Sequence, residues 1–451
     1  MNQHHTHRSV LRRIGVVAAF STAAALTLAG CSGGGGSGTA FADQAPSRVE
    51  GTVSLWHFFT DREAKAIDTA VKDFEKINPQ VKITIHSGQD DEKIAKIIAT
   101  GGKIDLAISG STDRVGSFCS TGSFRSLDGV IKRDKIDMSQ LTDTAKSYTS
   151  FDGKQCTLPM LADVYGLYYN TDLLSAAGYT TPPKTLSELE NMALKLTTFN
   201  ADGSIKTLGF NPMIGSYESA PTHYAPSVGA TWMNGNKSAI NSDAWKELMI
   251  WQKGFVDKIG YEKLQKFTAG LGDEWSADNA FQTGQLAMNI DGEWRVAFLA
   301  DQKPDLNYAT APFPTGDNHT DLYGGGYTSG TIAGIAKGSQ NPEAAWALLK
   351  YLTLNTDAVV KLANGIKNVP TTADALASPK LDFPPQFATF LDIAASPHLA
   401  TNPATIIGSG NQDTFATYWQ SYQSGKGGDL TAGLAKVDKD VDNSISLSTG
   451  P

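Results

Sequence analysis

Residues 151–190 read FDGKQCTLPMLADVYGLYYNTDLLSAAGYTTPPKTLSELE, and this stretch decides the fold class. Its apolar and aromatic run at residues 164–169 has the length of a buried strand, and residues 186–196 repeat apolar side chains at helical spacing. Further along the chain, residues 286–290 predict a strand and residues 342–352 a helix. Strands that alternate with helices predict an α/β fold.

The N-terminal side of this stretch shows the same alternation more regularly. A helix is expected from Asp61 onward, because residues 60–63 read TDRE, which has the form of a capping box. Asn78-Pro79 ends its apolar pattern. The neighbouring elements are predicted as strands at residues 53–56, 81–85 and 104–108 and a helix at residues 94–98. This β-α-β-α-β order is half of a doubly wound fold, so the whole chain predicts two α/β lobes.

The length and composition of the chain predict folded domains and argue against binding to nucleic acid. The chain has 451 residues, of which 41% are hydrophobic and 19% charged, so it is long enough for two or three folded domains. Thirty-eight basic and 46 acidic residues give a net charge of -8. Binding to nucleic acid depends on clustered lysine and arginine, which this acidic chain lacks. We therefore expect no nucleic-acid partner.

The N-terminus has the pattern of an exported lipoprotein. Residues 1–13 are polar and basic, residues 14–29 are apolar or small, and residues 28–31 read LAGC. This predicts a signal peptide at 1–30, lipidation of Cys31, a Gly/Ser-rich tether over 31–48 and a location on the outer face of the cell membrane. The apolar run is short for a permanent membrane span. The alternative is cleavage at another position, with an incidental Cys31.

Two further cysteines, Cys119 and Cys156, remain in a chain that leaves the reducing cytosol. An even pair in an exported protein predicts a disulfide. The alternative is that both are small buried hydrophobic side chains.

Four stretches of the chain resemble one family. Besides residues 151–190, these are AFQTGQLAM at 280–288 with GEW at 292–294, GGG at 324–326 and NPEAAW at 341–346. They resemble the family 1 extracellular solute-binding proteins, the sugar-capturing subunits of ABC importers related to maltose-binding protein. The resemblance covers about residues 53–445. It departs from the family at residues 101–105, which read GGKID where many relatives have a proline before the aspartate.

The resemblance implies a two-lobed periplasmic-binding-protein-like fold of type II, with a ligand cleft between lobes that are joined by hinge crossings. The first lobe would comprise residues 49–160 and 308–357, and the second residues 161–307 and 358–451. It implies a monomer that captures a mono- or oligosaccharide by hinge closure and delivers it to the permease subunits of an ABC transporter. No cofactor and no metal are expected.

The resemblance also implies a set of residues that contact the ligand, because sugars need aromatic plates and fixed donors and acceptors. Trp294 matches the family's best stacking plate, and Gly325 and Gly326 would let the backbone approach a sugar ring. Asp163 aligns with a ligand carboxylate of maltose-binding protein, and Asp113 and Arg114 align with an acidic-basic pair. The other candidates are His57, Phe58, Asp61, Tyr217, Tyr224, Trp232, Trp275, Tyr327, Asn411 and Gln412.

Each candidate also has a structural interpretation. Trp294 could belong to the core, Asp113 and Arg114 could be a solvated surface pair, and Gly325 and Gly326 could form a simple hinge turn. Trp245, Trp251, Trp346 and Trp419 lie at helical spacing and are expected in the core. Two other functions are considered, namely a binder of another solute such as a glycerophosphodiester and a lipid-anchored glycoside hydrolase. No common catalytic motif occurs, so we expect a binding protein.

Overall fold

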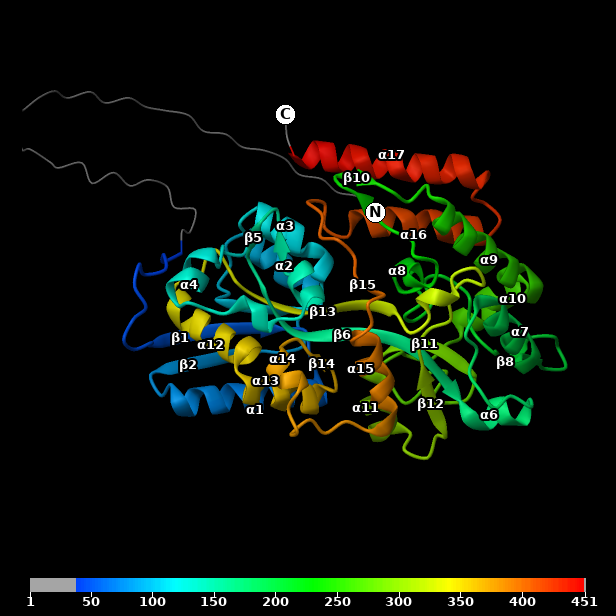
Figure 1. The fold of residues 1–451 in the computed structure, drawn as a ribbon, viewed down its shortest axis with the longest axis horizontal. Coiled ribbons are helices and arrows are strands. Elements are labelled where there is room, and N and C mark those ends of the chain that lie inside the picture. The colour runs from blue at the N-terminus through cyan, green and yellow to red at the C-terminus, as the bar shows by residue number, and fades with distance from the viewer. Residues whose placement is uncertain (1–37, 450–451) are drawn as a thin grey trace, which may run out of the picture. The chain divides into compact units, whose positions relative to one another are not determined.

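The computed structural model describes residues 38–449, so the predicted signal peptide and the lipidated Cys31 lie outside the described residues. Its main sheet has the strand order β11-β6-β13-β3-β1-β2 (Figure 1). The parallel part contains β1 (Gly51–His57), β2 (Val81–His86) and β3 (Leu106–Ser109). These strands alternate with α1 (Asp61–Ile77) and α2 (Asp91–Ala99). The β-α-β-α-β order predicted from the sequence is therefore confirmed.

Helix α1 forms because its apolar residues share one face. Ile67, Ala70, Val71 and Phe74 are buried, and the helix ends at Asn78, immediately before Pro79. The expected capping box is wrong: the Thr60 side chain makes no cap hydrogen bond. Asp61, the first helical residue, has a φ of 47°, so the chain enters the helix through a turn that differs from a capping-box entry. The capping box of this fold lies at Thr185 and Glu188, where α7 (Leu186–Leu196) begins.

Strand β6 (Leu158–Asn170) is the long central strand of the sheet. It pairs antiparallel with β13 (Gly326–Ile335), and the two strands run side by side through the middle of Figure 1. Its C-terminal half also pairs with β11 (Met288–Gly292) and β12 (Tyr308–Ala311). Because Leu158 and Leu161 pack in one core cluster and Val164 and Leu167 in another, β6 connects two separate cores.

The two cores are built from several separate segments of the chain. The smaller one holds β1, β3, α1, α12 (Pro342–Leu354) and α13 (Thr356–Ile366), and it extends to Ala375. The larger one holds most of residues 164–299, with Phe313 and the C-terminal helices. Helix α13, which contains residue 358, where the second lobe was expected to resume, packs with α1.

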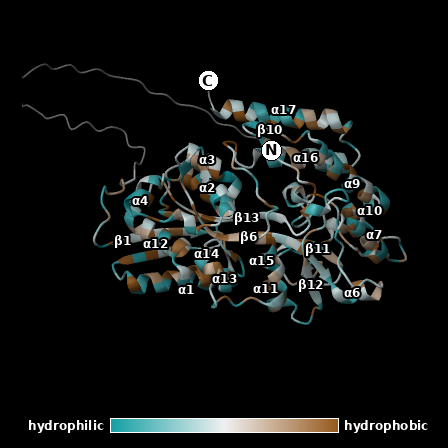
Figure 2. Cartoon of the chain, viewed as in Figure 1, coloured by the Kyte–Doolittle hydropathy of each residue, from teal (hydrophilic) through white to brown (hydrophobic). Residues whose placement is uncertain are grey.

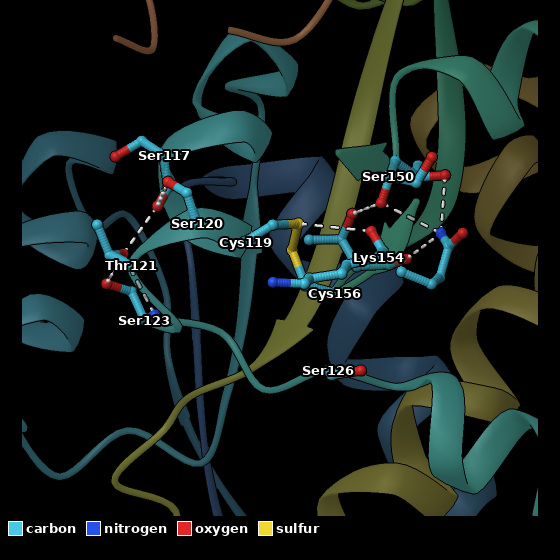
Figure 3. Close-up of a disulfide and its surroundings, with 12 residues drawn as sticks. Ser117, Cys119, Ser120, Thr121, Ser123, Ser126, Ser150, Lys154 and Cys156 are labelled. Carbon is cyan, nitrogen blue, oxygen red and sulfur yellow. Dashed lines mark hydrogen bonds between the residues drawn. A yellow bond between two sulfur atoms is a disulfide. The ribbon is translucent and has the colours of Figure 1, made fainter. Parts of the chain in front are cut away.

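The predicted disulfide between Cys119 and Cys156 is confirmed (Figure 3). Its Cα atoms lie 5.5 Å apart, within the range that a disulfide spans. Cys119 lies on α3 (Val115–Ser120), and Cys156 directly follows β5 (Lys154–Gln155). The bond therefore joins α3 to the short segment between β5 and β6.

Further elements complete the larger core and its surroundings. They are α8 (Pro221–Tyr224), α9 (Asp243–Ile259), α11 (Arg295–Gln302), β14 (Val369–Pro370), α15 (Ala388–Ala394), β15 (Leu399–Ala400), α16 (Gly410–Gln423) and α17 (Leu430–Thr449). Figure 2 shows hydrophobic residues along β1 and β2 and a mixture of both kinds along the surface helix α17. Within residues 38–449, no helix combines the length and apolar character that crossing a membrane requires.

Candidate functional site

A group of aromatic rings lies where β6, β11 and β13 meet, and we call it the aromatic cluster: Tyr165, His223, Trp294 and Tyr327. The ring of Tyr165 stacks on His223 at 3.9 Å and meets Trp294 edge-on at 5.3 Å. Tyr327 lies 5.4 Å from Tyr165 and 5.1 Å from His223. Each of these side chains comes from a different element, so the cluster depends on the tertiary fold.

Trp294 owes its position to the residues before it. A side chain at Gly292 would collide with the Trp294 ring, so this position requires glycine. Glu293 then fixes the turn after β11, because the backbone N–H of Val164 donates to its Oε2 at 2.6 Å. Trp275 lies 6.3 Å from Trp294, and 48% of its surface stays exposed. The two tryptophans therefore offer one covered and one open ring.

Asp163 and Glu293, which we call the acidic pair, lie beside the aromatic cluster. Asp163 accepts a hydrogen bond from Asn368 Nδ2, and Glu293 is fully buried. Burial and the Glu63 carboxyl raise the pKa of Asp163, whereas the Asn368 bond lowers it. Burial and Asp163 raise the pKa of Glu293 well above its ordinary value. Within the described residues, the partners of the two carboxyl groups are the Asn368 amide and the Val164 N–H, and neither of them is a cation.

Glu63 adds a third carboxyl from the other core. Burial raises its pKa from 4.5 to about 7, against the opposing charge of Arg62. The Arg62 guanidinium lies 3.6 Å from Glu63 and donates to Asp301 at 3.1 Å and to the carbonyls of Gly365 and Ile366. Arg62 is thus shared among several acceptors, which limits the charge compensation that Glu63 receives.

This predicts a pH-dependent effect of Glu63→Gln. Glutamine has no charge, so the variant should exceed the wild type in free energy of unfolding by an amount that grows as pH rises from about 4.5 to about 7. A carboxyl whose pKa is raised by folding stabilises the protein below its unfolded pKa and loses that contribution as pH rises through its folded pKa. The plateau difference should be about 2 to 3 kcal/mol, measured by urea unfolding across this range. A pH-independent difference would contradict the raised pKa.

A second acidic group lies behind the aromatic cluster. Carboxyl oxygens of Glu218, Glu274 and Asp291 all lie within 4.8 Å of one another, which is close enough to hold a cation. Arg295 supplies that positive charge: its Nε donates to Asp291 at 2.6 Å, and its Nη2 lies 3.9 Å from Glu274. Burial raises the pKa of all three acids, while Arg295 lowers it. This arrangement is a buried ion pair with surplus carboxyl groups.

Burial keeps two histidines neutral, one in the aromatic cluster and one at the end of β1. His223 Nδ1 lies against the backbone carbonyl of Glu218, and burial lowers the His223 pKa to about 4. The sequence candidate His57 ends β1 and is fully buried, and burial lowers its pKa to about 4 as well. Neither His57 ring nitrogen has a hydrogen-bond partner among the described residues. Its neighbour Phe58 is half-buried against Gly110, and Asp61 is exposed at the start of α1.

The other acidic-basic candidate pair also approaches the cluster. Asp113 lies in the short turn before α3, where burial raises its pKa and Arg114 lowers it. The turn that holds Asp113 packs against β13, whose Tyr327 belongs to the aromatic cluster. Arg114 donates to Glu92 at 3.3 Å. The structure therefore brings together Asp113, Asp163, Trp294 and Tyr327 from distant parts of the sequence.

Several candidates occupy packed positions. Trp232 is 3% exposed and packs against Trp245 and Phe415. The Tyr224 hydroxyl shares a hydrogen bond with the Ser219 hydroxyl. The Tyr217 hydroxyl donates to the Gly272 carbonyl and accepts from the Ala280 N–H. The space in front of Gly325 and Gly326 is filled by His398 and Ile393, so protein packing already explains why these positions need glycine.

Asn411 and Gln412 lie in the first turn of α16, which α17 follows. Asn411 is 1% exposed, and neither polar atom of its side chain has a partner within the described chain. Buried amides are normally hydrogen-bonded, so such an exception suggests a water or ligand contact. Gln412 is only partly buried.

Sequence reasoning missed several residues of the site. Tyr165 and Glu293 lie within the quoted motifs, but only Trp294 was chosen there. Glu63 was interpreted as a helix cap, and His223 and Asn368 carried no signal, because only the fold brings them to β6. The surroundings of the aromatic cluster combine flat rings with carboxyl and amide groups, which is the chemistry that binds a polyhydroxylated ligand.

Comparisons with known proteins agree with this geometry. The family described as bacterial extracellular solute-binding protein matches residues 60–359. A maltotriose-binding protein of Pyrococcus abyssi is 22% identical, with 73% of this chain and 69% of that protein covered. A maltooligosaccharide ABC transporter solute-binding lipoprotein of Streptococcus pneumoniae (strain TIGR4) is 26% identical, with 79% of each covered.

Solved structures share the fold. CpMnBP1 with mannotriose bound has a TM-score of 0.76 at 25% identity, covering 88% of this chain and 100% of that one. The sugar-binding protein MalE of Xanthomonas citri has a TM-score of 0.70 at 20% identity, with 88% and 98% covered. The two-lobed, type II α/β fold expected from the sequence is confirmed by these neighbours. The chain belongs to the family of bacterial extracellular solute-binding proteins.

Proposed function

We propose that this protein is the substrate-binding lipoprotein of an ABC importer and captures a mono- or oligosaccharide at the aromatic cluster. The observation that carries the proposal is the position of Tyr165, Trp294 and Tyr327 beside the acidic pair. Aromatic faces stack on the C–H faces of sugars, and carboxyl groups accept hydrogen bonds from hydroxyls. The relatives named for maltotriose, maltooligosaccharide and mannotriose support the same class of ligand.

The mechanism we propose is hinge closure between two lobes that follow the two cores. β6 passes from one core to the other, and β13 is hydrogen-bonded to it along its length. A ligand that contacts groups from both cores, such as Glu63 and Trp294, favours the closed state in proportion to its difference in affinity for the two states. The permease subunits would recognise that closed form and receive the sugar.

The N-terminal pattern supports a proposal for the location of the protein. We propose that residues 1–30 are removed, that Cys31 carries the lipid and that the tether holds a monomer at the outer face of the membrane. Export fits the Cys119–Cys156 disulfide, since such bonds persist in oxidising compartments. Globomycin treatment, which blocks lipoprotein signal peptidase, should cause accumulation of a longer precursor.

The alternatives receive less support. A glycerophosphodiester is an anion, and it would face Asp163, Glu293 and Glu63 across the site. The relatives are binding proteins, which supports binding without catalysis. Incubation with oligosaccharides separates these functions, because a hydrolase yields shorter products, whereas a binding protein gives a saturable thermal shift and returns the sugar intact.

The decisive variant is Trp294→Ala. Loss of the covered ring should raise the dissociation constant for a bound saccharide at least tenfold, equivalent to about 1.4 kcal/mol, measured by calorimetry. Trp251→Ala is a matched control, because Trp251 packs on Phe255 of its own helix α9. Unchanged affinity in a folded Trp294→Ala protein would remove this residue from the binding site.

A further inference from the structure

The hydrogen-bonding atoms left without partners beside the aromatic cluster include two strong acceptors. Glu293 Oε1 and Asn368 Oδ1 are both buried, and neither has a partner among the described residues. Asn368 is 3% exposed and uses its amide nitrogen to bind Asp163, so its free oxygen lies next to the acidic pair. A buried acceptor without a donor costs about 1 to 3 kcal/mol. A ligand that donates hydrogen bonds would satisfy these two oxygens, and Trp294 Nε1, which also lacks a partner among the described residues, would donate to an acceptor of the same ligand.

The charge of the site points the same way. The charge of Glu63 raises the pKa of Asp163, and the charge of Asp163 raises the pKa of Glu293. Both shifts have the sign expected for repulsion between carboxylates. The neighbouring arginines are already engaged: Arg62 with Asp301 and Glu63, Arg114 with Glu92, and Arg295 with Asp291. A neutral hydroxyl could satisfy the free acceptors but would not favour ionisation of the acidic pair, whose pKa values are raised. A bound cation would favour the ionised carboxylates and form an ion pair with them.

The aromatic cluster favours a cation as well. A positive charge is attracted to the faces of tryptophan and tyrosine rings, most strongly where water is excluded. Tyr165, Trp294 and Tyr327 are each less than 10% exposed and lie close together next to the acidic pair. Arg295 already uses this chemistry, since its guanidinium lies 5.5 Å from the Trp275 ring centre.

We propose that the ligand is a saccharide with a protonated amino group, which binds between the acidic pair and the rings of the aromatic cluster. The ammonium would donate to Glu293 Oε1 and Asn368 Oδ1, and the sugar ring would stack on Trp294. This inference rests on the proposed function and narrows it from sugars in general to amino sugars. An anionic sugar would be repelled by the same carboxyl groups in their ionised form.

The test compares three β-1,4-linked series of equal length, namely oligomers of glucosamine, of N-acetylglucosamine and of glucose, with maltooligosaccharides as a fourth series. At about pH 6, where a primary amine of a sugar is largely protonated, calorimetry should give at least tenfold tighter binding of the glucosamine series than of its N-acetylated counterpart. The glucosamine affinity should also fall more steeply with added salt than that of any neutral sugar.

Variants assign the effect to the acidic pair. Asp163→Asn and Glu293→Gln should each reduce the preference for the amino series by about tenfold and change the affinity for neutral sugars less. Asp143→Asn is the control, because its carboxyl lies fully exposed on α5 (Asp143–Ser147). Glu63→Gln provides a further test if a variant of the buried pair does not fold.

The outcomes distinguish the two levels of the proposal. Equal or tighter binding of neutral sugars in the wild type would overturn the amino-sugar inference and leave saccharide capture intact. A preference that survives both charge-removing variants would also overturn it. If none of the four series binds to the folded protein, the amino-sugar inference falls, and mannotriose, which is bound in the CpMnBP1 structure, then tests whether the proposed saccharide receptor stands.

Discussion

Replacing Arg295 with glutamine is expected to lower the free energy of unfolding by about 3 to 5 kcal/mol, because the change leaves buried carboxyl groups without their cation. The guanidinium is 1% exposed and its partner Asp291 is fully buried. Glu218 and Glu274 add to the same negative charge. Urea unfolding of the two purified proteins at neutral pH measures the difference.

Two further measurements identify the cause. Arg295→Lys keeps the charge and should lose less stability than Arg295→Gln. A lysine cannot, however, reproduce the simultaneous contacts of Nε with Asp291 and of Nη2 with Glu274. The loss in Arg295→Gln should also shrink as pH falls, because protonation of Asp291 removes the uncompensated charge. A variant as stable as the wild type at neutral pH would show that these acids are already protonated there and need no cation.

Loss of the disulfide is expected to be comparably costly. Cys119 and Cys156 are 37 residues apart, and closing a loop of that length in the unfolded chain accounts for about 4 kcal/mol in the chain-entropy model. The double variant Cys119→Ala/Cys156→Ala should therefore show a clearly lower Tm and urea midpoint. Reduction of the wild type with dithiothreitol should give a similar loss.

The control separates this loss from damage to packing. Both cysteines are buried in the small cluster with Phe118 and Phe124, so alanine also removes some contacts. The double variant treated with dithiothreitol should not change further, whereas the wild type should. If reduction leaves the wild-type Tm unchanged, the bond contributes nothing measurable to stability.

Much of the fold was predictable because periodicity reports burial. The helix at residues 186–196 agrees with α7 at both ends, and the apolar run at residues 164–169 lies inside β6. The strand at residues 286–290 begins two residues before β11. The capping box at Thr60 failed because a local motif does not determine the direction from which the chain enters a helix.

The site was predictable only in part. Trp294 and Asp163 were chosen through the family motifs, and the structure places Asp163 on β6 and Trp294 beside Tyr165 of the same strand. His223 and Asn368 were missed, since a single histidine or asparagine has no pattern and acquires a role only through tertiary contacts. Trp232 was a candidate ligand contact, but it packs in the core beside Trp245. Sequence alone does not distinguish such a ring from one that faces a ligand.

The interleaving of the two cores has a practical consequence for dissecting the molecule. The chain contributes to the smaller core, then to the larger one, returns at Ala333 and leaves again after Ala375. Neither half therefore corresponds to an uninterrupted fragment, so a truncation that keeps one half will expose apolar surface and aggregate. Reporter fusions and fluorophore pairs are better introduced at surface turns, such as the hairpin between β7 (Thr198–Phe199) and β8 (Ile205–Thr207), with the polypeptide left whole.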